Sequence, residues 1–426
     1  MSKFSLFYRK LATLAQSRAI PQRIARVSTI KREILPKSGQ PSIFLEFDSG
    51  ENLCVPLIWL RDHCRAEHSF NHSTHQRKHD CIGIFTRSLT KTEKLENESI
   101  QINPTGGLTI NWADGLKSNF SAEELIKWAM RKPAPPSAQL HTWWIGKKMQ
   151  DLPRIELSQF SMDKFVNLFC RFGFVMIDGV PATAEETEAL CRRVGIIHDT
   201  FFGAFWVFSN KSQERSETEE FHEDTAYTSE GIGPHTDGTY FQQSPGIQVF
   251  HCLQPATSGG ETILLDAFAA ADYLKEIDAQ AHKTLTTQKI DHHYLESNNR
   301  GNDIYSYTRE YPVIETDSNG IYRQIRFNPY DRAPMQSLSE SIDDAEKVVD
   351  FYKAYESYSR IILDKDRQLK VMLNPGTVIF IDNFRLLHAR TEFQGDRTLC
   401  GTYMSRDDFF ARARPFLPIN HRAYYA

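Results

Sequence analysis

The sequence of 426 residues lacks any long hydrophobic run. Its longest apolar stretches, such as residues 378–381, have the length of a strand, whereas a membrane-spanning helix needs roughly 18 residues. A surplus of basic residues is also missing, because 50 lysines and arginines are set against 54 acidic residues, for a net charge of −4. Such a chain is poorly suited to neutralise the phosphates of a nucleic acid or an anionic membrane. We therefore expect no nucleic-acid partner and no membrane association.

Cysteines are also scarce, and the seven present form no Cys-x-x-Cys motif. An odd, scattered set in a chain of this length indicates a reducing compartment rather than a disulfide framework. The glycine-rich motifs that bind nucleotide phosphates are absent as well. The sequence does contain 40% hydrophobic and 12% aromatic residues, which is enough to build two or three globular domains at about 150 residues each.

The amino-terminal segment, residues 1–32, differs in composition from the rest. It holds eight basic residues and no acidic residue before Glu33. Basic, hydroxyl-rich segments without acidic residues are typical of mitochondrial transit peptides, and a disordered basic tail is the alternative. We expect import into the mitochondrial matrix and exclude this segment from the fold.

Residues 36–131 predict a small β-rich domain. Short β-type runs there are broken by glycine, asparagine and aspartate, as in strands joined by tight turns. The proline-rich stretch at residues 132–137 cannot continue a helix or a central strand, so we expect a linker over residues 132–150. The strands predicted in the small domain cover residues 43–47, 55–60 and 108–112.

Residues 151–426 predict the larger domain, mostly β with flanking helices. It opens with a helix over residues 161–171, a strand over 174–177, and a second helix that Thr183 and Glu186 begin as a capping box. The strands that follow favour a double-stranded β-helix, or jelly roll, over a parallel α/β sheet. They cover residues 247–253, 262–265, 322–327, 371–373, 377–382 and 399–404.

One long helix interrupts these strands, from about residue 342 to residue 362. Its apolar residues recur at i, i+3 and i+4 spacing, which predicts a stripe that packs on the sheet. The stripe consists of Val348, Phe351, Tyr352, Tyr355, Tyr358 and Ile362.

A metal site is indicated by His235 and Asp237. At i and i+2 on a strand, the two side chains point to the same side. Such a pair is expected by chance in a chain of this size, so a third ligand is needed. His388 follows another predicted strand, and two histidines with one carboxylate form the facial triad of non-haem Fe(II) oxygenases. Arg397 stands nine residues later, where a guanidinium can grip the distal carboxylate of 2-oxoglutarate.

Two other interpretations use the same residues. A jelly-roll protein that binds a small cation or metal without turnover would need neither an intact triad nor the arginine. A zinc hydrolase with the same three ligands has no obvious use for a carboxylate-gripping arginine. The presence of Arg397 therefore disfavours both of these interpretations.

Several longer motifs resemble the trimethyllysine dioxygenases, in the γ-butyrobetaine dioxygenase/trimethyllysine hydroxylase family of Fe(II)/2-oxoglutarate oxygenases. The resemblance covers nearly the whole chain after residue 40, and the sister γ-butyrobetaine dioxygenases are the rival assignment. The motifs are HTDGTYF at 235–241, GIQVFHCL at 246–253, FIDNFRLLH at 380–388, LCGTYMSRDD at 399–408, WLRDHC at 59–64 and THQR at 74–77.

This resemblance implies hydroxylation of N6-trimethyl-L-lysine at C3 to 3-hydroxy-N6-trimethyl-L-lysine, the first step of carnitine biosynthesis. It implies that His235, Asp237 and His388 hold Fe(II), with ascorbate as reductant. Arg397 would hold the C5 carboxylate of 2-oxoglutarate, and Thr262 would add a hydroxyl contact to this cosubstrate. A homodimer is a further family expectation.

Substrate residues also follow from the resemblance. A trimethylammonium group donates no hydrogen bond, so aromatic faces recognise it, and Phe202, Trp206 and Tyr227 occupy the positions of the family's cage. Relatives tend to have tyrosine at the position of Phe202. Asp224 stands where the butyrobetaine enzymes have asparagine, and its carboxylate suits an α-ammonium, which only trimethyllysine has. A capping or loop aspartate is the alternative for Asp224. Asn328 and Tyr330 would meet the substrate's carboxylate.

The small domain departs from the family at its structural zinc site. Only Cys64 matches the family's zinc ligands, whereas Ser69 and Leu116 stand where a cysteine and a histidine would be expected. We therefore expect no family-type zinc. The alternative is a rebuilt site in the segment that holds His63, His68, His72, His75, His79 and Cys81.

Overall fold

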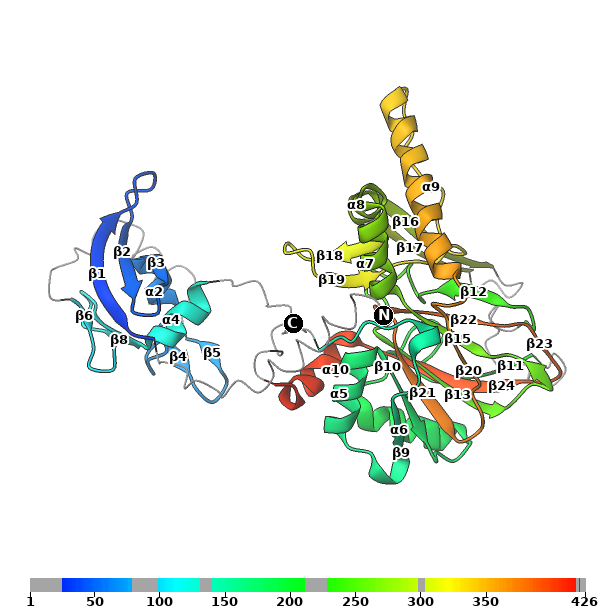
Figure 1. Ribbon diagram of the computed structural model, residues 1–426. Helices are drawn as coiled ribbons and strands as arrows, with labels where there is room; N and C mark the ends of the chain where they lie inside the picture. Colours follow the sequence, from blue (N-terminus) through cyan, green and yellow to red (C-terminus); the bar gives the residue numbers. More distant parts are fainter. Residues whose placement is uncertain are drawn as a thin grey trace, which may run out of the picture. The chain divides into compact units, whose positions relative to one another are not determined.

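The computed structural model describes residues 25–78, 99–130, 140–210, 228–297, 303–418 and His421 (Figure 1). The chain divides into two compact units, Met1–Pro133 and Ala134–Ala426, and both are mostly β with a few helices. Among the described helices, none combines the length and the apolar character needed to cross a membrane.

The small unit is built from two three-stranded antiparallel sheets that share one core. Ile43 and Leu45 of one sheet and Leu108 and Phe120 of the other are almost fully buried in it. The predicted strands at 43–47 and 108–112 are confirmed. The elements are β1 Val27–Ile34, β2 Pro41–Phe47, β3 Asn52–Pro56, α2 Leu57–Asp62, β4 Phe70–Asn71, β5 Gln76–Arg77, β6 Ile100–Ile102, β7 Leu108–Asn111, β8 Lys117–Phe120 and α4 Ala122–Ala129.

Two predictions for this unit need correction. Residues 57–60 form the helix α2 rather than the end of a strand, because Leu57, Leu60 and Arg61 are buried at i, i+3 and i+4 spacing. The segment 1–32 was excluded from the fold, but β1 pairs along its length with β2. The folded part therefore begins before Val27, and residues 1–24 lie outside the described part.

The large unit contains two sheets, ordered β11-β24-β13-β21-β10-β9 and β12-β22-β15-β20. Met176 and Ile381 of the first and Leu264 and Leu386 of the second lie in one buried cluster, so the sheets pack face to face. Their strands are β9 Arg154–Glu156, β10 Phe174–Asp178, β11 Trp206–Ser209, β12 Ile232–His235, β13 Ile247–Gln254, β15 Thr262–Asp266, β20 Leu369–Val371, β21 Thr377–Asp382, β22 Leu386–Arg390 and β24 Thr398–Met404.

Four of the strands predicted here, at 247–253, 262–265, 377–382 and 399–404, are confirmed by β13, β15, β21 and β24. The strand predicted at 371–373 lies two residues earlier, because its last pair joins Val371 to Thr262, where β15 begins. The strand predicted at 322–327 ends at Ile325 and pairs with β18, outside both large sheets.

Two helices predicted near the start of this unit are confirmed as α5 (Met162–Phe172) and α6 (Ala184–Val194). The capping box at Thr183 forms only in part. Its hydroxyl accepts the Glu186 N–H, but the Thr183 N–H donates to the Pro181 carbonyl instead of to Glu186. Both helices share a core with the six-stranded sheet and α10 (Arg406–Ala413).

The long predicted helix is α9 (Ile342–Leu363). It packs mainly against α7 (Ala267–Ile277) and α8 (Ala279–Thr287), and its buried stripe shares one core with Leu265 of β15 and Leu387 of β22. Phe351, Tyr355 and Tyr358 are buried as predicted, whereas Tyr352 is 49% exposed. The remaining elements are β14 Ser258–Gly259, β16 Lys289–Ser297, β17 Asp303–Pro312, β18 Ile314–Thr316, β19 Tyr322–Ile325, β23 Phe393–Gln394 and the 3-10 helices η3 Gly146–Lys148, η4 Leu157–Gln159 and η6 Arg414–Phe416.

The second half of the predicted linker, residues 140–150, is part of the large unit. The Trp144 indole N–H donates to the Phe172 carbonyl over 2.8 Å, and the Gly146 N–H donates to the Arg367 carbonyl. Residues 131–139 lie outside the described part. A linker can thus extend no further than residue 139.

The turn between β21 and β22 carries a fully buried ion pair. Arg385 Nη2 lies 2.6 Å from Asp266 Oδ2, and both side chains are 0% exposed. Arg385 also donates to the carbonyls of Arg171 and Thr142. Asp266 caps α7 by accepting the Ala269 N–H and accepts the Trp144 N–H. One ion pair thus joins the turn, α7 and the segment around Trp144.

We predict that Arg385→Met destabilises the protein by about 3–5 kcal/mol, because the Asp266 carboxylate stays buried without its partner. Urea unfolding of the full chain measures this loss. Lys147→Met is the matched control, since it removes an exposed ion pair with Asp366 and should leave the midpoint unchanged. Equal midpoints for the two variants would contradict the prediction.

Candidate metal centre and its cavity

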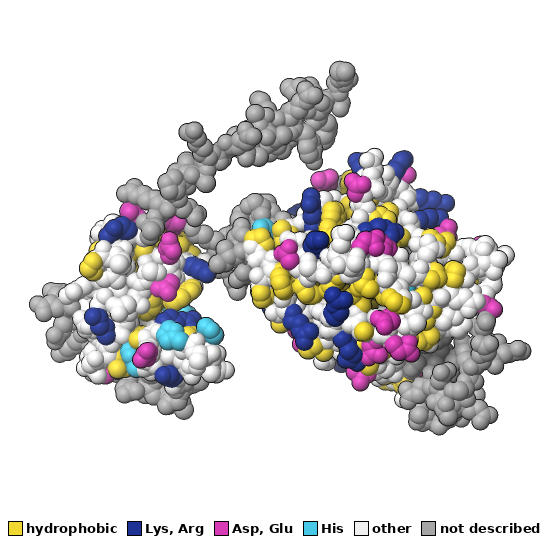
Figure 2. All heavy atoms as spheres, turned by 90° about the horizontal axis from the view of Figure 1, so that it is seen from below, with side chains coloured by type: hydrophobic (Ala, Val, Ile, Leu, Met, Phe, Trp, Pro, Cys, Tyr) yellow, Lys and Arg dark blue, Asp and Glu magenta, His cyan; other side chains and the backbone are white. Residues whose placement is uncertain are grey.

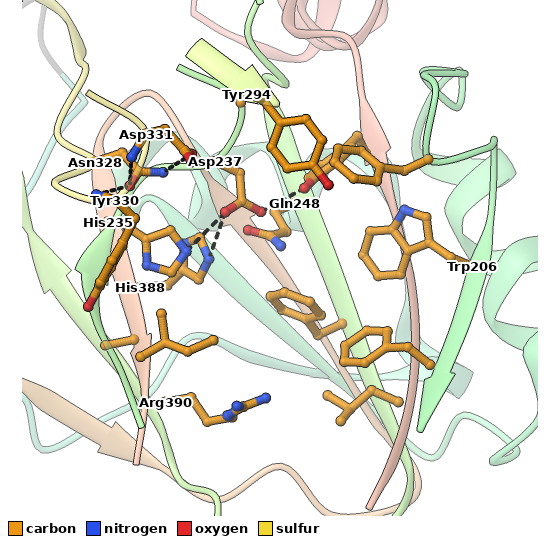
Figure 3. A pocket seen from close by; sticks show the side chains of 18 of the residues that line it. Trp206, His235, Asp237, Gln248, Tyr294, Asn328, Tyr330, Asp331, His388 and Arg390 are labelled. Carbon is orange, nitrogen blue, oxygen red and sulfur yellow. Dashed lines mark hydrogen bonds and ion pairs between the residues drawn. The ribbon is translucent and has the colours of Figure 1, made fainter. Parts of the chain in front are cut away.

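His235, Asp237 and His388 are brought together by the pairing of β12 with β22. The antiparallel register places His235 directly opposite His388, and their ring centroids are 4.4 Å apart. Asp237 Oδ1 lies 3.1 Å from His235 Nε2 and 3.4 Å from His388 Nε2. Figure 3 shows the three side chains converging on one point. One ligand atom from each lies within 4.8 Å of the others, so the predicted triad is assembled.

Neighbouring groups fix the orientation of two of these ligands. His235 Nδ1 lies 2.8 Å from the Gly233 carbonyl, so it carries the proton and leaves Nε2 as the ligand atom. Asp237 Oδ2 accepts a hydrogen bond from the Tyr403 hydroxyl over 2.9 Å. Asn383 accepts the Asp237 N–H and donates to its carbonyl, both over 2.9 Å. Hydrogen bonds thus fix the position of both the backbone and the carboxylate of Asp237.

The charge state of Asp237 also suits a cation. Burial raises the pKa of the Asp237 carboxyl, but His388 and His235 outweigh this effect and hold the pKa well below its usual range. Burial, together with the nearby His235, lowers the pKa of His388 more than Asp237 raises it. For His235, burial lowers the pKa, but the hydrogen bond that the ring donates to Asp237 and the negative charge of this carboxylate help to raise it overall. The carboxylate is therefore ionised, ready to act as a ligand.

Two imidazoles and one carboxylate on one side fit Fe(II), which this donor set binds while leaving coordination positions open for small ligands. Within the described part of the chain, no other group of three histidine, cysteine or acidic side chains is close enough to share a metal ion.

The triad lies in a cavity of about 470 Å³ between the two sheets of the large unit. Figure 3 shows Trp206 and Tyr294 on one side of the triad and Arg390 on another. The cavity is lined by Phe202, Trp206, Phe208, Gly231, Ile232, His235, Asp237, Gly238, Tyr240, Gln248, Phe250, Thr262, His293, Tyr294, Leu295, Asn328, Tyr330, Asp331, His388, Ala389, Arg390, Arg397, Leu399 and Tyr403.

Most of the predicted ligand-binding residues line this cavity. Phe202, Trp206, Thr262 and Arg397 do so, as do Asn328 and Tyr330. Asp224 and Tyr227 lie outside the described residues.

Arg397 is 6% exposed, and burial lowers the pKa of its guanidinium. Its guanidinium carbon lies 5.5 Å from the centre of the Phe393 ring. Arg390 approaches the same ring to 5.0 Å and donates to the carbonyls of Thr228 and Glu230. Two guanidiniums therefore mark one end of the cavity, and sequence reasoning found only Arg397.

Asn328 is bonded mainly within its own turn. Its amide donates to Asp331 and to the Thr236 carbonyl, and its carbonyl accepts the N–H groups of Tyr330 and Asp331. The Tyr330 hydroxyl accepts the Gly233 N–H over 2.8 Å. Asn328 thus shapes the cavity wall, and Tyr330 braces the strand that carries His235.

Sequence reasoning missed Gln248, Tyr294 and Tyr403 in addition to Arg390. Gln248 and Tyr403 lie within motifs that were recognised, and they face each other across β13 and β24. Alternation along each strand could have indicated that they share a face with known site residues. Tyr294 had no such signal, because its strand β16 was not predicted.

In the small unit, Cys64 Sγ lies 3.9 Å from His68 Nε2. Histidine side chains lie on the visible face of this unit (Figure 2). His72 instead contacts the Arg65 carbonyl. His79 and Cys81 lie outside the described residues.

Comparisons with known proteins match both units. The family model described as taurine catabolism dioxygenase TauD, TfdA family, matches residues 133–403. A model described as gamma-butyrobetaine hydroxylase-like, N-terminal, matches residues 37–126.

Individual relatives cover most of the chain. It is 32% identical over 374 residues to the mitochondrial trimethyllysine dioxygenase of Rattus norvegicus, covering 84% of this chain and 81% of that protein. It is 30% identical over 393 residues to the trimethyllysine dioxygenase of Meyerozyma guilliermondii, covering 87% and 92%. The crystal structure of a taurine dioxygenase from Burkholderia xenovorans matches with a TM-score of 0.41, 14% identity and coverage of 60% and 88%.

We predict that Tyr403→Phe weakens Fe(II) binding about 10- to 100-fold, because the Asp237 carboxylate loses the hydrogen bond that orients it. An anaerobic Fe(II) titration measures this affinity. Tyr307→Phe is the matched control: it also removes a tyrosine hydroxyl bonded to an aspartate, Asp291, away from the cavity. Unchanged affinity in Tyr403→Phe would remove this tyrosine from the metal site.

Proposed function

The chain belongs to the taurine catabolism dioxygenase TauD, TfdA family, and from this premise we propose that it is an Fe(II)- and 2-oxoglutarate-dependent dioxygenase that hydroxylates N6-trimethyl-L-lysine at C3. The product is 3-hydroxy-N6-trimethyl-L-lysine, in the first step of carnitine biosynthesis. The observation that carries the proposal is a facial triad, a buried arginine and a set of aromatic rings in one cavity. The relatives named trimethyllysine dioxygenase support the choice of substrate.

His235, Asp237 and His388 would hold the iron. When bound, the iron and 2-oxoglutarate supply the oxidising chemistry, with ascorbate as reductant. The protein's own part is positioning. Gly233 and Tyr403 keep the ligand atoms aimed at one point, and the cavity walls hold the substrate's C3 against the metal site and limit access of water.

The arginine end of the cavity suits the cosubstrate. Arg397 is buried and lines the cavity, so its guanidinium can take the C5 carboxylate of 2-oxoglutarate bidentately. Thr262 is 6% exposed and lines the cavity. It lies on β15 directly opposite Arg390 of β22, so it belongs to the arginine end of the cavity wall.

The aromatic end suits the trimethylammonium group. Phe202 and Trp206 present rings to the cavity, and Tyr227 completes this cage in the proposal. Asp224 attracts the α-ammonium of trimethyllysine and disfavours γ-butyrobetaine, which has no such group. Tyr330, on the turn shaped by Asn328, stands at the wall where the substrate's carboxylate would lie.

The finer architectural and cellular assignments belong to the same proposal. The two packed sheets are consistent with a double-stranded β-helix, or jelly roll, with the small β-rich domain before it. A mitochondrial transit peptide at the amino terminus would direct the enzyme to the matrix, as the mitochondrial relatives suggest. We propose a homodimer as the assembly.

The function is tested by succinate formation with Fe(II), 2-oxoglutarate and ascorbate. We expect trimethyllysine to stimulate it, with hydroxylated product confirmed by mass, and γ-butyrobetaine to do so far less. Preferential stimulation by γ-butyrobetaine would overturn the substrate assignment and the role of Asp224. No stimulation by either would overturn the proposed function.

We predict that Arg397→Met raises the KM for 2-oxoglutarate roughly 10- to 150-fold, the range for losing hydrogen bonds to a charged group. Fe(II) affinity should stay within about twofold, because Arg397 does not contact the triad. Steady-state kinetics measure the first quantity and metal titration the second. Arg193→Met, on the surface helix α6, is the control. An unchanged KM in Arg397→Met would contradict the anchor role.

A further inference from the structure

Tyr294 brings a ring to the cavity from β16, an element that none of the predicted site residues shares. Its side chain is 8% exposed and lines the cavity. Figure 3 places its ring near the side of the triad that faces Trp206, away from Arg390. The ring meets Phe202 edge-on at 5.5 Å and lies 5.1 Å from Tyr240. Tyr294 therefore belongs to the aromatic end of the cavity.

A buried carboxylate contacts the hydroxyl of this ring. Glu296 is 6% exposed, and because it lies two residues after Tyr294 on the strand, both side chains point to the same face. The Tyr294 hydroxyl donates to Glu296 Oε2 over 2.9 Å. A phenol that donates to a carboxylate becomes more electron-rich, and the negative charge lies close by. Both effects favour a cation at the ring.

Two other aromatic groups at this end differ from Tyr294 in this respect. Phe202 has no hydroxyl. Tyr403 also donates to a carboxylate, but that carboxylate belongs to Asp237, whose charge is committed to the metal site. Tyr294 thus supplies a ring whose hydroxyl is bonded to a carboxylate outside the triad.

The geometry points to Tyr294, supported by Glu296, as a specificity-determining residue that binds the quaternary ammonium group of the substrate. The ligand class is a cation without N–H donors, which must be recognised by ring faces and nearby negative charge rather than by hydrogen bonds. The inference rests on the proposed function, and it adds a selectivity element from the β16–β17 hairpin.

The test is calorimetric titration of the full chain with Fe(II) and 2-oxoglutarate under strict exclusion of oxygen, so that binding is measured without turnover. The two probes are trimethyllysine and its uncharged isostere, in which carbon replaces the quaternary nitrogen. The wild type should prefer the charged probe. Tyr294→Leu should weaken its binding about 3- to 30-fold while changing that of the isostere by less than about twofold. Two further variants, Glu296→Gln and Tyr294→Phe, should lose part of the preference for the charged probe over the isostere.

Tyr305→Leu is the matched control. It lies on the partner strand of the same hairpin but is 66% exposed and opposite Leu295, so binding of both probes should be unchanged. If Tyr294→Leu weakens both probes equally, or neither, the inference is overturned while the proposed function stands. The same holds if the wild type binds both probes equally well. If the wild type binds neither, the proposed function fails and the inference with it.

Discussion

The buried ion pair between Arg385 and Asp266 is the interaction on which the active centre depends. Two charges in a 0% exposed setting are tolerated only because further hydrogen bonds satisfy them. Those bonds come from α7, from Trp144 and from the carbonyls of Thr142 and Arg171. The pair therefore fixes the turn between β21 and β22 against three other segments at once.

The same turn carries the group that positions the metal ligand. Asn383 stands two residues before Arg385 and bonds both the N–H and the carbonyl of Asp237. It also donates to the Pro245 carbonyl. Because β22 begins directly after the turn, the position of His388 follows from the same anchor. The register opposite His388 then sets His235. A buried structural charge pair and a catalytic centre are thus parts of one continuous arrangement.

The sequence predicted the triad and the arginine because alternation along a strand and long motifs are local signals. The spacing of His235 and Asp237 predicted a shared side on a strand, whereas β12 ends at His235 and Asp237 lies in the turn that follows it. Arg397 follows His388 at a short distance in the sequence. The elements against which a segment packs are set instead by residues that are distant in the sequence. Residues 57–60 form a helix because their burial repeats at helical spacing against the small core. The contacts of α9 with α7 and α8 join segments that are distant in the sequence. Arg390 stands two residues after His388 on β22, so alternation along the strand could have indicated it. Tyr294 could not be predicted as a site residue, since only the folded strand β16 brings it to the cavity.

The cavity separates opposite charges along its length, and this separation explains how one site can accept two different charged molecules. Arg390 and Arg397 both approach Phe393, which places positive charge at one end, where the proposed dianionic cosubstrate would be stabilised. Figure 3 shows Tyr294 and Arg390 on opposite sides of the view, and the Tyr294 hydroxyl donates to a buried carboxylate. A cationic head is repelled from the arginine end and attracted to the ring end. The metal ligands lie between these ends, so a substrate held by its cationic head presents its chain, rather than its charge, to the metal.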